Sequence, residues 1–194
     1  MSFSCSPLKE ELPKKVKRHL FCFGGPSVVQ LNKGRCSRMP MTHNLRAFLK
    51  ENHVSYKAFI HMSSFTAQQL AHSKHMTGEK VAKVVLLKSG SGYVMAVLPA
   101  CYKVNFSSLK TILGDQELRL ATEAEIRKLF PDCEIGTMPP FGNLYHLKVY
   151  VDESLTRQET IAFPAGTHMD AIELKYEDFA KLTKPEVEKF SVHT

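Results

Sequence analysis

The sequence lacks a hydrophobic run that could cross a membrane, which takes about 20 residues. In a chain of 194 residues, 43% of them hydrophobic, the longest apolar stretch covers residues 81–87 and contains a lysine. The N-terminus shows no hydrophobic segment followed by a small-residue cleavage site, as a secretory signal would. We therefore expect a single-domain core, no membrane contact and a cytoplasmic location.

Cysteine is also scarce. The five cysteines are odd in number and widely spaced, and no Cys-x-x-Cys pair occurs. This pattern argues for a reducing compartment and against a disulfide or zinc framework. His72 and His75 would share a helix face, but no third metal ligand is evident. Gly-x-Ser-x-Gly, the nucleophile motif of α/β-hydrolases, is absent too, so the residues predict neither a metal nor a cofactor.

The positive charge is concentrated at the N-terminus. Residues 1–40 contain eight Lys or Arg and two Glu, which gives +6 of the total +7 and leaves +1 for the rest. Several prolines and glycines interrupt this segment. We interpret residues 1–40 as a basic, poorly ordered extension that either binds a polyanion or has no role. Residues 41–185 form the predicted domain and 186–194 a C-terminal tail.

Hydrophobic periodicity predicts helices and strands interspersed along this domain. Thr122 and Glu125 fit a capping box at the start of one helix. Expected helices cover 43–53, 67–76, 106–113, the segment after Thr122, and 176–182; expected strands cover 54–61, 81–87, 93–98, 118–120, 145–151, 160–163 and 168–175. Because hairpins occur among the helices, the pattern favours an α+β domain with a mixed sheet over a doubly wound fold.

One of these strands carries an unusual lysine. Val81 to Leu87 is apolar on both alternating faces, as in a strand covered on both sides, yet Lys83 lies within it. Burying an ammonium group is costly unless the group is paired or faces a wet cleft. Lys83 therefore either extends to solvent near an edge or lines a pocket.

Two loops also suggest a binding site. Gly136 to Gly142 (GTMPPFG) combines stiff prolines with permissive glycines, a composition that can fix backbone groups toward a ligand. Pro164 to His168 (PAGTH) places small residues, which allow close approach, before a histidine. Each loop taken alone also fits a tight turn.

The lysine strand VAKVVLLK, the loop GTMPPFG and the segment FPAGTHMDAIEL, in this order, resemble the YbaK/prolyl-tRNA-synthetase-associated domain family. The flanking segments SSFTAQQLA, YVMAVLP and LATEAEI fit as well. The resemblance covers about residues 41–185. It implies a mixed, barrel-like sheet flanked by helices, and an aminoacyl-tRNA editing deacylase that hydrolyses the ester of a misacylated tRNA.

The resemblance also assigns site residues. It implies that Lys83 is catalytic and that the two loops bind the substrate. The implied substrate-binding residues are Gly136, Thr137, Met138, Pro139, Pro140, Gly142, Ala165, Gly166, Thr167 and His168. The implied partners are the acceptor end of a misacylated tRNA and an aminoacyl-tRNA synthetase. Because Met138-Pro139 and Thr167-His168 could alter the pocket, the amino acid removed stays open.

Three functions remain possible at this point: a free-standing deacylase, a non-catalytic module of the same fold that binds tRNA or an aminoacyl-like ligand, and a regulatory protein recruited to RNA by its extension. A lysine in an apolar strand favours the enzyme. Lys83 itself could anchor a phosphate, polarise the ester or act as a base.

Overall fold

The computed structural model describes residues 41–60, 76–90 and 92–193. The basic extension of residues 1–40 lies outside this part of the chain. So do the histidine pair and nearly all of the helix expected over 67–76. What the sequence predicts for those segments therefore stays a prediction.

The described elements are short and alternate along the chain. The helices are α1 (His43–Glu51), α3 (Phe106–Leu113), α4 (Glu123–Leu129) and α5 (Tyr176–Thr183), with 3-10 turns η1 (Gly142–Tyr145) and η2 (Glu153–Arg157). The strands are β1 (Tyr56–Ile60), β2 (Ala82–Ser89), β3 (Gly92–Pro99), β4 (Tyr102–Val104), β5 (Arg119–Leu120), β6 (Lys148–Asp152), β7 (Thr160–Pro164), β8 (Asp170–Lys175), β9 (Glu186–Glu188) and β10 (Ser191–His193).

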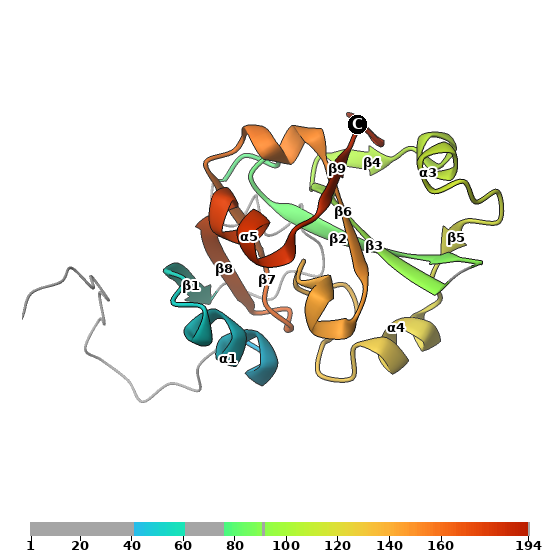
Figure 1. Cartoon of the computed structure of the whole chain (residues 1–194). Coiled ribbons are helices and arrows are strands. Elements are labelled where there is room, and N and C mark those ends of the chain that lie inside the picture. Colours follow the sequence, from blue (N-terminus) through green and yellow to red (C-terminus); the bar gives the residue numbers. More distant parts are fainter. Residues whose placement is uncertain (1–40, 61–75, 91, 194) are drawn as a thin grey trace, which may run out of the picture. The chain divides into compact units, whose positions relative to one another are not determined.

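These strands form three sheets. The largest has the order β5-β2-β3-β6-β9, in which β5, β2 and β3 pair antiparallel while β6 joins β3 and β9 joins β6 in parallel. The second sheet, β1-β8-β7, is antiparallel, and β10 pairs with β4. Figure 1 shows the two larger sheets with the helices around them. The predicted α+β class with a mixed sheet is confirmed, and the described strands do not close into a barrel.

Strand β2 is covered on both faces, as its sequence predicts. Ala82 and Leu86 belong to one buried cluster, which also includes Leu45 of α1. Leu87 points to the other face and packs in a second cluster with Leu109 of α3. The central strand therefore separates two cores, which explains its lack of a polar face.

Local signals position several helix ends correctly. Thr122 and Glu125 form the predicted capping box at the start of α4. Asn105 accepts a hydrogen bond from Ser108 N at the start of α3, and Gly114 ends that helix in the left-handed conformation at φ 65°. Both devices satisfy backbone groups that a helix terminus leaves without partners.

Some strand boundaries differ from the predicted ones. The strand expected from Tyr145 begins at Lys148, because Gly142–Tyr145 forms η1. The strand expected from His168 begins at Asp170. After α5 the chain does not end as a tail but adds β9 and β10, which the sequence did not reveal because each has three residues. Strand β4 was missed for the same reason.

A cluster around Glu125 joins α4 to the edge of the largest sheet. Its carboxylate accepts hydrogen bonds from Arg119 Nη1 and Nη2 at 2.9 and 2.8 Å and from Tyr93 Oη at 2.9 Å. It also accepts from Thr122 N at 2.8 Å, and Lys88 Nζ lies 3.4 Å away. The pKa of Glu125 lies far below its usual range, and the hydrogen bonds from Arg119 are the largest cause.

Replacing Glu125 with glutamine is therefore expected to lower the melting temperature at pH 7. Because the folded-state pKa of Glu125 lies below its unfolded value, its contribution is present above about pH 4.5 and is lost as the pH falls further. The difference between Glu125→Gln and wild type should thus shrink in acid. Thermal melts across pH 3–7 measure it, with Glu123→Gln on the same helix as the control, since its ion pair with Arg127 is exposed. A difference that does not depend on pH would contradict this role of Glu125.

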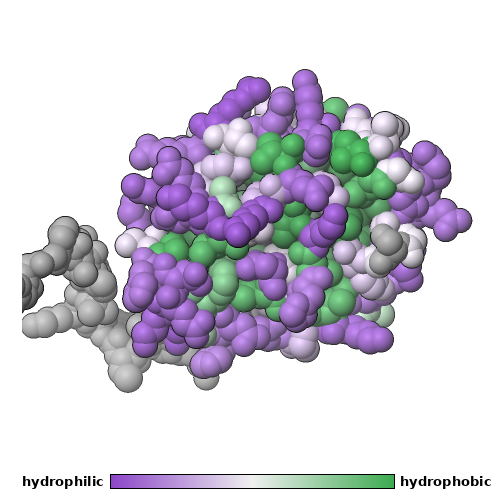
Figure 2. All heavy atoms as spheres, viewed as in Figure 1, coloured by the Kyte–Doolittle hydropathy of each residue, from purple (hydrophilic) through white to green (hydrophobic). Residues whose placement is uncertain are grey.

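The surface is mostly hydrophilic, but Figure 2 shows hydrophobic side chains reaching it near the centre of one face. Among the described residues, the large hydrophobic side chains that are exposed are Leu120, Met169, Val187 and Val192. In the ranges that the structure describes, no helix is both long and apolar enough to span a bilayer.

Candidate active site

The structure joins the two loops that the sequence singles out. Glu134 N donates to Gly166 O at 2.9 Å, and Gly166 N donates to Thr137 O at 3.0 Å. Within the first loop, Thr137 N and Oγ1 both donate to Glu134 O, at 3.1 and 2.8 Å. Segments about 30 residues apart in sequence are thus tied by paired backbone hydrogen bonds, a juxtaposition that hydrophobic periodicity does not predict.

The second loop is a closed turn between β7 and β8. Ala165 N donates to Asp170 O at 2.9 Å, and Thr167 Oγ1 donates to Asp170 Oδ2 at 2.6 Å. Gly166 has a φ of 106°, which side-chain-bearing residues rarely adopt. On its outer side Thr42 N donates to Ala165 O at 3.0 Å. The turn is therefore held between the start of the described domain and the Gly136–Gly142 loop.

Several residues of the first loop are buried. Met138 is 4% exposed and belongs to the core cluster that also contains Phe141 and Ala165. Pro139 and Pro140 are buried as well. At Gly142 a Cβ atom would lie 2.6 Å from Val149 Cγ2, so this glycine permits close packing against β6. The buried residues hold the loop against the core. Gly136 in this loop and His168 in the second loop, in contrast, keep solvent-accessible surface.

Lys83 is half-buried near the start of β2, and its Nζ donates to Ala100 O at 3.2 Å. Burial is the main cause that lowers the pKa of its ammonium group; Cys101 opposes this shift and Lys103 adds to it. Burial also raises the pKa of the Cys101 thiol. Lys83 therefore does not extend fully into solvent, as a surface lysine would.

The lysine strand starts beside the strand that leads into the second loop. Val81 forms a parallel bridge with Ala162, and Ala162 N donates to Lys80 O at 2.9 Å. Lys83 lies two residues after Val81, and Pro164 lies two residues after Ala162. Among the described residues, however, no hydrogen bond joins Lys83 to either loop. The backbone thus brings the start of β2 against β7, and the Lys83 side chain donates to Ala100 O.

A thiol, a phenol and a carboxylate lie close to the first loop. Tyr145 Oη donates to Asp132 Oδ1 at 3.0 Å, and Cys133 Sγ lies 3.6 Å from Tyr145 Oη. Burial raises the pKa of Cys133 to about 12. A protonated thiol is a poor nucleophile, which agrees with the absence of any sequence signal for cysteine catalysis. In the described ranges, no group of three His, Cys, Asp or Glu side chains is placed to hold a metal.

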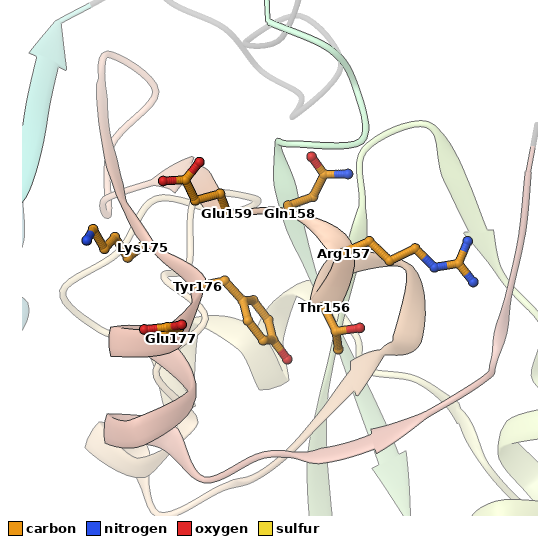
Figure 3. Close-up of a pocket in the computed structure, with 7 residues that line it drawn as sticks. All are labelled: Thr156, Arg157, Gln158, Glu159, Lys175, Tyr176 and Glu177. Atoms are coloured by element: carbon orange, nitrogen blue, oxygen red, sulfur yellow. The ribbon is translucent and has the colours of Figure 1, made fainter.

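One pocket among the described residues lies away from these loops. It has a volume of about 340 Å³ and is lined by Thr156, Arg157, Gln158, Glu159, Lys175, Tyr176 and Glu177. Figure 3 shows that its residues come from the end of η2 and from the β8–α5 junction. Its wall carries both charge signs and includes none of the predicted site residues.

Comparison with known proteins gives one family and several relatives. The model of the aminoacyl-tRNA editing domain family matches residues 61–182. A relative from Escherichia coli K12, the "Multifunctional Ser/Thr-tRNA deacylase ProXp-y", is 28% identical over 156 residues, which cover 77% of this chain and 93% of that protein.

Two further comparisons add context. A proline–tRNA ligase from Thermosipho africanus is 36% identical over 77 residues, which cover 40% of this chain and 14% of the ligase. The solved structure of a protein proposed to be a trans-editing enzyme for prolyl tRNA synthetase superposes with a TM-score of 0.71 at 21% identity, covering 80% of this chain and 99% of that one. At this identity the likeness shows the fold.

Proposed function

The chain belongs to the aminoacyl-tRNA editing domain family, and we propose that it is a deacylase that hydrolyses the ester of a misacylated tRNA in trans. The observation that carries this proposal is the match to the E. coli deacylase, which spans 93% of that protein. The matched 156 residues make up nearly all of that deacylase, so little of its length is left for a synthetase. The proline–tRNA ligases match over a small part of their length. This supports a functional association of the chain with a synthetase.

We place the aminoacyl end of the tRNA on the two joined loops. Ester hydrolysis needs a positioned water and donors for the developing oxyanion. Backbone groups of the Gly136–Gly142 loop and of the turn from Ala165 to His168 meet there, held by hydrogen bonds between Glu134, Thr137 and Gly166. A backbone held in this way loses little entropy when it binds a substrate.

We assign Lys83 the role of a cation. An ammonium group carries three donors, and Ala100 O accepts one of them. The remaining donors are available for a phosphate of the terminal adenosine or for the ester carbonyl. Because burial strengthens electrostatic interactions, a half-buried Lys83 would stabilise negative charge more than an exposed lysine does.

The substrate class follows from the relative and is part of the proposal. The E. coli protein is named for Ser/Thr-tRNA, so we expect small hydroxyl-bearing amino acids to be removed. A deacylase acts on tRNA that a synthetase has charged. We therefore expect the chain to act in the cytoplasm alongside an aminoacyl-tRNA synthetase.

A deacylation assay tests this function. The full chain is incubated with seryl-, threonyl-, alanyl- and cysteinyl-tRNA and with correctly charged prolyl-tRNA. We expect rapid release of seryl or threonyl groups and sparing of prolyl-tRNA. If the folded protein binds these tRNAs without releasing any amino acid, the chain is a binding module of the same fold and the proposed function is wrong.

A further inference from the structure

We propose that Glu134 is a positioning residue that sets which aminoacyl group the site accepts, an inference that rests on the proposed deacylase function. Glu134 contacts the second loop at two points. Its backbone N donates to Gly166 O at 2.9 Å, and its Oε2 accepts a hydrogen bond from His168 N at 2.6 Å. No sequence pattern singles out Glu134, because it precedes the Gly136–Gly142 loop and resembles any surface glutamate.

The carboxylate of Glu134 binds the tip of a turn that also has hydrogen bonds of its own. Thr167 Oγ1 donates to Asp170 Oδ2 and accepts from Met169 N at 3.3 Å. Ala165 N donates to Asp170 O. These bonds stiffen the turn, and Gly166 N ties its start to Thr137 O of the first loop. At the tip, His168 N donates to Glu134 Oε2. A charged acceptor makes this bond stronger than a neutral one.

Loss of the carboxylate should therefore move the tip of the turn without unfolding it. The backbone bonds of Glu134 and Gly166 do not involve the carboxylate, and the turn keeps its internal bonds. His168, whose side chain is 22% exposed, would lose its backbone contact with Glu134. A looser wall accepts a larger group, so selectivity should change more than stability.

The contact acts through the backbone N–H of His168. The His168 imidazole also lies near the carboxylate, with Nε2 3.9 Å from Oε2, which is too long for a hydrogen bond. Replacing the imidazole should therefore leave the grip intact. Removing the carboxylate should release the turn whether or not the imidazole is present.

The test compares kcat/KM for threonyl-tRNA and seryl-tRNA, which differ by one methyl group. In Glu134→Ala we expect the threonyl-to-seryl ratio to rise about tenfold or more, which begins at the lower end of the range that one methylene provides in other enzymes. Glu134→Gln, which keeps an acceptor for His168 N, should recover most of the wild-type ratio. Loss of folded protein would scale both rates equally and leave the ratio unchanged, so the ratio separates positioning from a merely structural role.

Glu123→Ala, the same change at an exposed glutamate of α4, is the matched control and should keep the wild-type ratio. In a His168→Ala background, Glu134→Ala should still raise the threonyl-to-seryl ratio. If it does not, the contact does not act through the backbone N–H of His168. An unchanged ratio in Glu134→Ala, with the wild type active, would overturn the proposal. A wild type inactive on both tRNAs would instead reject the deacylase function, so the two failures are distinguishable.

Discussion

Replacing Lys83 with alanine should lower kcat/KM for deacylation by about 10²–10³-fold, the loss seen when one charge-stabilising donor is removed from a hydrolytic site. Lys83→Met should do the same, because it keeps the aliphatic stem and removes the charge. Since the one hydrogen bond that the Lys83 side chain makes to the described residues is to Ala100 O, melting temperatures should change little.

Lys88→Ala is the matched control for this experiment. Lys88 lies on the same strand, but its ammonium group pairs with Glu125 at 3.4 Å. We expect Lys88→Ala to retain activity. Full activity in Lys83→Ala would leave the family membership intact and refute the role of this lysine.

The pH dependence of the reaction follows from the same assignment. Burial lowers the pKa of Lys83 from its ordinary value of 10.5. If the ammonium form is active, kcat/KM falls as the pH rises through this lowered pKa, after spontaneous ester hydrolysis is subtracted. A rate that rises through the same pH range and is lost in Lys83→Met would instead identify Lys83 as a base.

Replacing Gly166 with alanine should destabilise the protein by about 3 kcal/mol, the sum of a strained backbone and a steric clash. Gly166 has a φ of 106°, and an added Cβ would overlap Thr42 Cγ2. Thr42 is 7% exposed and its backbone N is bonded to Ala165 O, so it has little room to move. For a chain of this size the expected drop in melting temperature is about 6–12 °C.

Gly90→Ala provides the comparison for this change. Gly90 is exposed, and the nearest atom to an added Cβ is Asp115 Oδ2 at 4.0 Å, an ordinary contact. Its melting temperature should stay within about 2 °C of wild type. We also expect Gly166→Ala to lose deacylation at temperatures where it remains folded, because we propose that the substrate binds at this turn. Equal melting temperatures for the two variants would contradict the described geometry of Gly166.

The elements that the sequence predicted well are those with strong local signals. The apolar run of β2, the capping box at Thr122 and the helix over 106–113 are each specified by neighbouring residues, and the structure confirms them. The short strands β4, β9 and β10 were missed because three residues are too few for a periodic pattern, and their pairing depends on distant partners.

The candidate site was predictable in parts. Its two loops stand out by their glycine and proline content, but their hydrogen bonding through Gly166 and Thr137 is a tertiary contact. Glu134 carries no sequence signal, since its role arises from where the second loop lies. The partner of Lys83 was also hidden, because Ala100 contributes a backbone oxygen, which no side-chain pattern reveals.

The site itself is tested most directly by titrating the protein with 3′-seryl-amido-3′-deoxyadenosine, a terminal aminoacyl-adenosine in which an amide replaces the ester. Amide shifts are followed by ¹H–¹⁵N NMR. We expect the largest shifts at Gly136, Thr137, Gly166 and His168, and weaker binding by Lys83→Met. Shifts confined to the pocket around Tyr176, with none at the joined loops, would contradict the proposed site.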